Sequence, residues 1–249
     1  MQAVILAGGR GSRLAAGCPK PLAPIGGRPV LWHVVRLLNA QGIDDVLVAL
    51  GHHAAEIVRA LAPAAGMAGT VVCDAAALGL AGRLRLVDTG TEADTAGRLA
   101  RLRPHLGAAA FLLAWCDGLA DLDLAALLAH HRRCRRLVTV AAVHPPSRFG
   151  HLVLDGDRAV GFREKPRLDD QWINGGFFVV EPGVLSWIAG EAASWERDVL
   201  VRLAAADQLA AYRHEGFWQC LDTVRDQEEL EAVWRRGAAP WLRRPAMAE

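Results

Sequence analysis

The sequence predicts an α/β fold in which helices flank a mostly parallel, Rossmann-like central sheet. Two apolar runs, residues 3–7 and 46–50, contain no alternation with polar residues, as is typical of strands buried on both faces of a parallel sheet. Between them, residues 29–42 carry an apolar stripe at helical spacing. A strand, a helix and a second strand in this order form the βαβ unit from which such sheets are built.

The remaining elements continue this alternation along the chain. The first helix starts at Pro29, whose fixed φ suits a first helical position. Residues 62–82 are rich in alanine and glycine and predict a loop with one strand near 70–72. The periodicity predicts further helices at 54–61, 95–102, 123–133 and 228–234, and further strands at 84–88, 110–115, 138–143 and 175–180. Two-residue alternation on either side of Asp155-Gly156 predicts a β-hairpin over residues 151–162.

Composition restricts the class of protein. The chain has 249 residues, 52% of them hydrophobic, and a formal net charge of +1, which argues against binding to nucleic acid. It contains five cysteines and no Cys-x-x-Cys pair, so neither a disulfide framework nor a zinc site is indicated. We find no signal-peptide pattern, no apolar run long enough to span a membrane and no internal repeat. We therefore expect a single-domain, cytoplasmic protein without a membrane partner.

The stretch that follows the first predicted strand combines glycines with fixed positive charge. Gly8, Gly9 and Gly11 let the backbone bend sharply and present N–H groups to an anion. Arg10 and Arg13 lie beside these glycines, and Lys20 follows between two prolines. The stretch has neither the lysine register of a P-loop nor the third glycine of a dinucleotide loop. It predicts a cradle for several phosphates.

These residues carry a family resemblance. The run Leu6-Ala7-Gly8-Gly9-Arg10-Gly11-Ser12-Arg13-Leu14, followed by Pro19-Lys20-Pro21-Leu22, resembles the signature of the sugar-phosphate nucleotidylyltransferases. Ser12 stands where the family usually has threonine and keeps the hydroxyl group. From Leu86 to Trp241 the chain is most similar to the family's cytidylyltransferases, which use CTP and glucose 1-phosphate. The segments that match there are 86–90, 97–99, 117–118, 145–150, 164–166, 172–178, 195–197, 216–219 and 222–223.

The resemblance implies the nucleotidyltransferase fold with an inserted hairpin region for the sugar, and a role for each matching residue. Asp117 and Asp222 would hold Mg²⁺. Lys20, Arg10 and Asp117 would be catalytic, with Lys20 at the reacting phosphates and Arg10 at the departing pyrophosphate. The nucleotide would be bound by Leu6, Ala7, Gly8, Gly9, Gly11, Ser12, Arg13 and Arg98. The sugar phosphate would be bound by Glu164, Lys165, Asn174 and Gly175. Residues 1–143 would thus form a nucleotide half, 144–226 a sugar-phosphate half, and 227–249 a C-terminal helix and tail.

Several alternatives stay open at this level. The same scaffold could use dTTP or UTP, or the chain could be a non-catalytic regulator that binds nucleotide sugars and acts on a partner; we expect a homo-oligomer in either case. Arg98 could be a solvent-facing residue at a helix start. Cys116 replaces an expected glycine and would place a side chain close to the metal site. His130, His131 and Cys134 have a spacing that could ligate a metal, although a solvated helix end explains them better.

Overall fold

The computed structural model describes residues 1–9, 18–66, 69–145, 147, 149–164 and 171–242. An eight-stranded sheet forms its centre, in the order β13-β9-β12-β7-β1-β4-β6-β5. The strands of this sheet are β1 Gln2–Leu6, β4 Asp45–Leu50, β5 Thr70–Cys73, β6 Arg83–Asp88, β7 Phe111–Trp115, β9 Val138–Val143, β12 Ile173–Val180 and β13 Leu209–Arg213. The predicted α/β class is confirmed, and so is the single strand inside residues 62–82.

The sheet is mostly parallel, and its two exceptions have a simple cause. β5 pairs antiparallel with its only neighbour β6, and β12 pairs antiparallel with both β7 and β9. Within the residues that the structure describes, no helix lies between β5 and β6 or between β9 and β12 in the chain, and parallel neighbours need a crossover connection that is usually helical. All the other pairings in this sheet are parallel.

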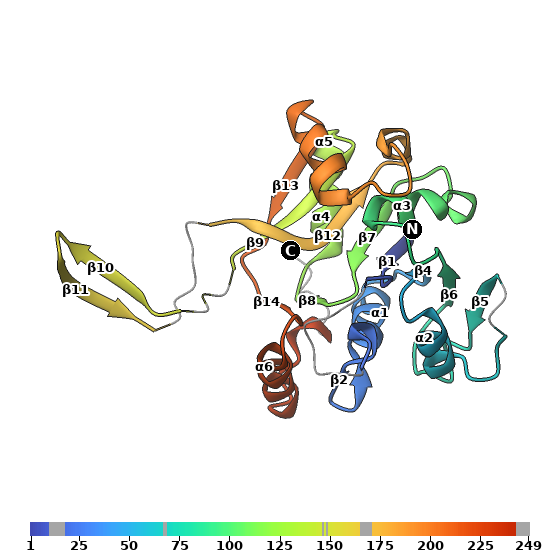
Figure 1. Cartoon of the computed structure of the whole chain (residues 1–249), viewed down its shortest axis with the longest axis horizontal. Coiled ribbons are helices and arrows are strands. Elements are labelled where there is room, and N and C mark those ends of the chain that lie inside the picture. Colours follow the sequence, from blue (N-terminus) through green and yellow to red (C-terminus); the bar gives the residue numbers. More distant parts are fainter. Residues whose placement is uncertain (10–17, 67–68, 146, 148, 165–170, 243–249) are drawn as a thin grey trace.

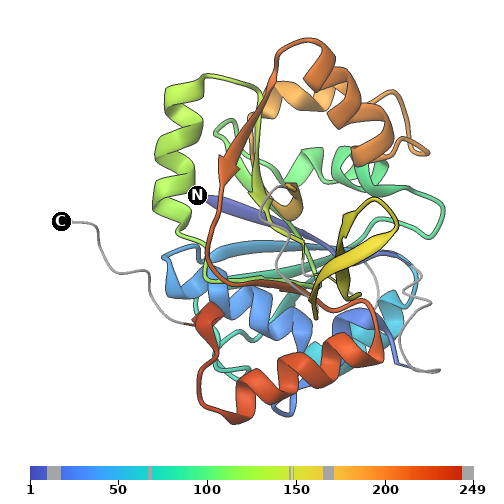
Figure 2. The ribbon, with the colours of Figure 1, turned by 90° about the vertical axis from the view of Figure 1, so that its left-hand side faces the viewer.

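Helices cover both faces of the sheet (Figures 1 and 2). α1, α2 and α6 lie on one face, and α3 and α5 lie on the other. The helix bounds are α1 Val30–Ala40, α2 Ala54–Leu61, α3 Thr95–Arg101, α4 Leu124–Cys134, α5 Val201–Ala205 and α6 Val224–Arg235. Helical turns are present at η1 Lys20–Leu22, η2 Arg103–His105, η3 Pro182–Trp187, η4 Trp195–Leu200 and η5 Pro240–Leu242. In the part of the chain that the structure describes, no helix combines the length and apolar character needed to cross a membrane.

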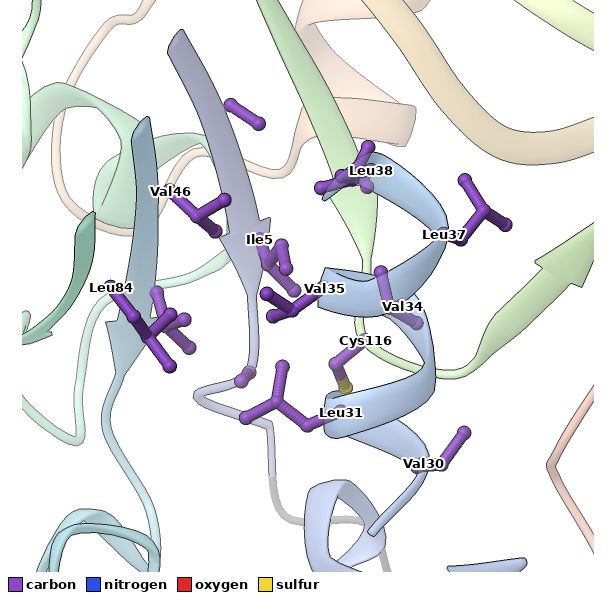
Figure 3. Close-up of a cluster of buried hydrophobic side chains, with 14 of the residues drawn as sticks. Ile5, Val30, Leu31, Val34, Val35, Leu37, Leu38, Val46, Leu84 and Cys116 are labelled. Atoms are coloured by element: carbon purple, nitrogen blue, oxygen red, sulfur yellow. The ribbon is translucent and has the colours of Figure 1, made fainter. Parts of the chain in front are cut away.

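The core is built where α1 crosses the strands (Figure 3). Leu31 and Val35 of α1 pack beside Ile5 of β1, and the same apolar cluster includes Val46 of β4 and Leu84 of β6. All five side chains are at most 2% exposed. Burying a side chain of this size contributes about 1.5–3 kcal/mol. This packing fixes the strands whose carboxyl ends carry the candidate site.

Three short two-stranded sheets complete the fold. β2 Pro24–Ile25 pairs with β3 Arg28–Pro29, and β8 Gly118–Ala120 pairs with β14 Trp218–Cys220. The predicted hairpin is confirmed as β10 His151–Asp155 and β11 Arg158–Arg163, and Gly156 adopts a φ of +58° in its turn. β8, β13, β14 and the helical turns are elements that the periodicity did not predict, because each is short or only partly buried.

Candidate active site

Two acidic residues that lie far apart in the sequence meet at the carboxyl edge of the sheet. Asp117 follows β7 and comes directly before β8, and Asp222 follows β14. The antiparallel pairing of β8 with β14 sets Gly118 opposite Cys220. The amide of Leu221 also donates to the Asp117 carbonyl at 2.9 Å. The two carboxylates are therefore positioned by backbone hydrogen bonds rather than by flexible side chains alone.

Lys20 joins these two carboxylates. Its Nζ donates to Asp117 Oδ2 and, at 2.5 Å, to Asp222 Oδ1. The lysine side chain is 17% exposed, so the ion pairs lie partly out of solvent. Burial alone would lower the pKa of Lys20, but the two carboxylates outweigh burial and raise that pKa above its ordinary value. The ammonium group is thus firmly cationic at a point where two carboxylates converge.

Two cavities adjoin this cluster and share Trp115 and Asp117 in their walls. The first, of about 230 Å³, has the glycine-loop residues on one side and α3 on the other. Its lining includes Leu6, Ala7, Gly8, Gly9, Lys20 and Arg98. The second, of about 380 Å³, opens beside β12 and β14 and includes Asn174, Gly175, Trp218 and Asp222. The arrangement offers two adjacent ligand spaces with Asp117 between them and Lys20 within reach.

Comparison with known proteins shows which protein family this chain belongs to. Residues 2–231 match the nucleotidyl transferase family. This chain belongs to the nucleotidyl transferase family. It is 38% identical over 253 aligned residues to the glucose-1-phosphate cytidylyltransferase of Salmonella typhi, covering 97% of this chain and 98% of the relative. It is 32% identical to a probable glucose-1-phosphate cytidylyltransferase of Bacillus subtilis, covering 97% and 99%.

A protein of known structure has a fold similar to that of this transferase. HddC from Yersinia pseudotuberculosis superposes with a TM-score of 0.70 at 20% sequence identity, covering 94% of this chain and 99% of that protein. At this identity the likeness concerns the fold alone. With the family match, the predicted nucleotidyltransferase class and its fold are both confirmed.

Arg98 of the transferase is buried, and its side chain both holds neighbouring strand ends together and lines the first cavity. It is 5% exposed, which contradicts the solvent-facing alternative. Its guanidinium donates to the Leu50 carbonyl at 3.1 Å, to Thr89 Oγ1 at 3.0 Å and to the Gly90 carbonyl at 2.6 Å. A Cβ atom on Gly8 would overlap the same guanidinium. Arg98 therefore connects the carboxyl ends of β1, β4 and β6, which are neighbours in the sheet.

At the second cavity, the backbone of β12 lies very close to the backbone of the neighbouring strand β9. A Cβ atom on Gly175 would lie 2.8 Å from the Ala141 carbonyl, so no larger residue fits there without a shift. The Gly175 carbonyl accepts a hydrogen bond from Trp218 Nε1 at 2.8 Å, which ties β12 to β14. Asn174 Oδ1 accepts from the Gly176 amide at 2.8 Å. Among the described residues predicted to bind the sugar phosphate, Glu164 does not line this cavity.

Cys116 lies between the hydrophobic core and the site, and it lines the first cavity together with Lys20 and Asp117. Its side chain is buried beside Leu31 and Val34 of α1 (Figure 3). Cys116 and Asp117 form the turn between β7 and β8. Burial raises the pKa of the Cys116 thiol, which keeps it neutral. The residue fills the core beneath the site.

The histidine pair of α4 is not a metal site. His131 is buried and bonds Thr139 Oγ1 at 2.8 Å and Glu181 Oε1 at 3.1 Å. His130 instead bonds the Cys134 sulfur at 3.2 Å, so the two rings diverge. Across the described part of the chain, no group of three or more His, Cys, Asp or Glu side chains is arranged to hold a metal ion. Mg²⁺ needs fewer, because it commonly takes one or two carboxylates with waters and substrate phosphates.

The structure brings together some of the residues that the sequence predicts for the site. Lys20, Asp117 and Asp222 are brought together, and Leu6 to Gly9, Arg98, Asn174 and Gly175 line the two cavities. Arg10, Gly11, Ser12, Arg13 and Lys165 lie outside the described residues. Sequence reasoning missed Trp115, which borders both cavities, and Trp218, which binds the Gly175 carbonyl. Their proximity to Asp117 and Asp222 in the sequence was the available signal.

Proposed function

We propose that this transferase joins CTP to glucose 1-phosphate, giving CDP-glucose and pyrophosphate. The convergence of Lys20, Asp117 and Asp222 beside two adjoining cavities supports this reaction, and the names of its 38% identical relatives support the substrates. A phosphate oxygen of glucose 1-phosphate forms a bond to the α-phosphorus of CTP. The bond from that phosphorus to the bridging oxygen of the β-phosphate breaks, and pyrophosphate leaves.

The nucleotide is assigned to the first cavity and the sugar phosphate to the second. Leu6, Ala7, Gly8 and Gly9 line the first cavity and would contact the nucleotide. The family resemblance adds Gly11, Ser12 and Arg13 to the nucleotide contacts and assigns Arg10 to the departing pyrophosphate. Arg98 holds the cavity wall at the nucleotide. Asn174 and Gly175, which line the second cavity, would contact the sugar. The family resemblance assigns Glu164 and Lys165 to the sugar phosphate. Lys20 reaches the α-phosphate, where negative charge increases during transfer.

A divalent cation, Mg²⁺, is proposed between Asp117 and Asp222. The donor set fits, because both carboxylates already direct oxygens at one cationic atom and Mg²⁺ prefers oxygen ligands. When bound, the ion would neutralise phosphate charge and orient the two substrates. Lys20 lies between the two carboxylates, and with an ion held there its ammonium group would be available to the substrate phosphates.

Pyrophosphate release tests the assignment. Each of CTP, dTTP, UTP, ATP and GTP is combined with glucose 1-phosphate and with other sugar 1-phosphates in the presence of Mg²⁺. We expect CTP with glucose 1-phosphate to give the highest kcat/KM. A preference for dTTP or UTP would overturn the base assignment and leave the reaction class intact. Nucleotide-sugar binding without release from any pair would favour the regulatory alternative.

The cellular setting is proposed from the cysteines. All five are free: Cys18 is exposed, and the others are buried or half-buried. Free thiols persist in a reducing compartment. We therefore place the transferase in the cytoplasm, where its nucleotide substrate is made.

A further inference from the structure

Asp222 lies between two secondary-structure elements and belongs to neither. β14 ends at Cys220, and α6 begins at Val224. The backbone amide of Asp222 is therefore not part of a strand ladder or of a helix, and a buried backbone donor needs a partner of some kind. This amide donates to Oδ2 of Asp226 at 3.0 Å. The direction of the Asp222 carboxylate thus depends on a side chain four residues further along the chain.

The Asp226 carboxylate does more than cap α6. In a capping box, the side chain at the third helical position accepts a hydrogen bond from the amide of the N-cap residue. Asp226 does this for Thr223 at 2.8 Å, and Thr223 Oγ1 accepts in turn from the Asp226 amide at 3.2 Å. The bond from the Asp222 amide is additional, because Asp222 precedes the N-cap residue. One carboxylate oxygen therefore holds both the start of the helix and the acidic residue before it.

Asp226 is itself held in place. It is buried, with 8% of its surface exposed. α6 packs against β2 and is tied to the segment that follows Lys20, because the Gly26 amide donates to Glu231 Oε2 at 2.6 Å. The helix that holds Asp222 is thus fixed to the part of the chain that carries Lys20.

We propose that Asp226 is a positioning residue for the transfer reaction, which directs the Asp222 carboxylate toward Asp117 by holding the Asp222 amide. This role rests on the proposed function, in which Asp222 is an Mg²⁺ ligand. Asp226 lines neither cavity, so its effect on the reaction passes through Asp222. Loss of a group that orients a metal ligand commonly weakens metal affinity or activity about 10–100-fold. A helix cap without this role would affect stability alone.

Hydrogen exchange tests the positioning without any turnover. Asp226→Ala removes both acceptor bonds, whereas Thr223→Ala breaks the same capping box and leaves the bond from the Asp222 amide, so it is the matched control. In residue-resolved deuterium exchange of the substrate-free chain, the Asp222 amide should exchange at least about 10-fold faster in Asp226→Ala. Its rate should not change in Thr223→Ala. An Asp222 amide that exchanges equally slowly in Asp226→Ala and in the unmodified chain would overturn the proposal.

The Mg²⁺ dependence of pyrophosphate release connects this bond to the reaction. The Mg²⁺ concentration that gives half-maximal activity should rise about 10–100-fold in Asp226→Ala and change little in Thr223→Ala. Asp226→Asn keeps a side-chain oxygen for the two amides and should recover most of the loss, since the role requires position rather than charge. Equal losses in Asp226→Ala and Thr223→Ala, or no recovery in Asp226→Asn, would contradict the role.

Two controls keep these outcomes separate. Circular dichroism confirms that each variant is folded, and Asp226→Ser, which removes the same bonds with a residue suited to a helix start, replaces Asp226→Ala if alanine prevents folding. If the unmodified chain releases no pyrophosphate with any substrate pair, the proposed function fails. The exchange rate of the Asp222 amide still decides whether Asp226 holds Asp222.

Discussion

Lys20 and Arg98 are two cations in the wall of one cavity, yet they have opposite surroundings. Lys20 is held by two carboxylates and keeps 17% of its side-chain surface exposed. Arg98 is 5% exposed, and the hydrogen bonds described for its guanidinium go to backbone carbonyls and one hydroxyl. One cation therefore faces ionised partners, and the other faces neutral groups of the fold.

This contrast separates a reactive group from a structural one. In the proposed complex, substrate phosphate would replace the carboxylates around Lys20, and Mg²⁺ would replace the ammonium group between the carboxylates. The bonds of Arg98 tie the carbonyl groups of Leu50 and Gly90, at the ends of β4 and β6, to α3, and each hydrogen bond of this kind contributes about 0.5–1.5 kcal/mol. A ligand cannot take them over without loosening the sheet edge. Substitutions should thus affect turnover at Lys20 and stability at Arg98.

The largest effect is expected for Lys20→Met. Removing one preorganised donor at a centre of developing charge lowers turnover about 10²–10³-fold. The KM for CTP should change much less, because the ground-state nucleotide keeps its other contacts. Steady-state kinetics with each substrate varied in turn provide the measurement. Lys20→Arg retains the charge and should recover part of the rate, whereas an unchanged kcat in Lys20→Met would remove Lys20 from the reaction.

The next effect concerns the two carboxylates as a unit. Asp117→Asn and Asp222→Asn should each lower turnover by at least about 10²-fold, since either loss empties a shared cation site. The double variant should then lose little more than the worse single variant. Asp121→Asn is the control, because Asp121 lies on the same segment and pairs with His214 at 3.1 Å instead. A double variant that shows the full product of both losses would mean separate roles.

The fold and the site differ in how well they could be predicted from the sequence. The central strands and α1 were predicted well because their apolar runs are long and continuous. Lys20, Asp117 and Asp222 were predicted as one site only through their family resemblance. Their physical link is the register of β8 against β14, two strands of three residues each, too short to produce a periodic pattern.

The role of Arg98 could not be read from its neighbours in the sequence. Position 98 lies in α3 between Gly97 and Leu99, where an arginine on a solvated helix face would look the same. Its burial depends on the absence of a side chain at Gly8 and Gly51, at the ends of two different strands. Cys116 is a similar case, since it lies in the turn between β7 and β8 and its burial against α1 results from tertiary packing. The burial of both side chains is determined by tertiary packing, which the local sequence does not show.

The smallest effect on turnover, and the clearest on stability, is expected for Arg98→Met. Methionine fills part of the space but donates no hydrogen bonds, so the free energy of unfolding should fall by about 2–3 kcal/mol. Urea denaturation monitored by circular dichroism measures this change. Arg101→Met is the matched control: Arg101 lies three residues later in α3 and donates to the Thr89 carbonyl at 2.6 Å, but its side chain is 38% exposed. It should destabilise the fold less than Arg98→Met does. Stability that is unchanged in Arg98→Met, together with a large increase in the KM for CTP, would instead make Arg98 a direct nucleotide contact.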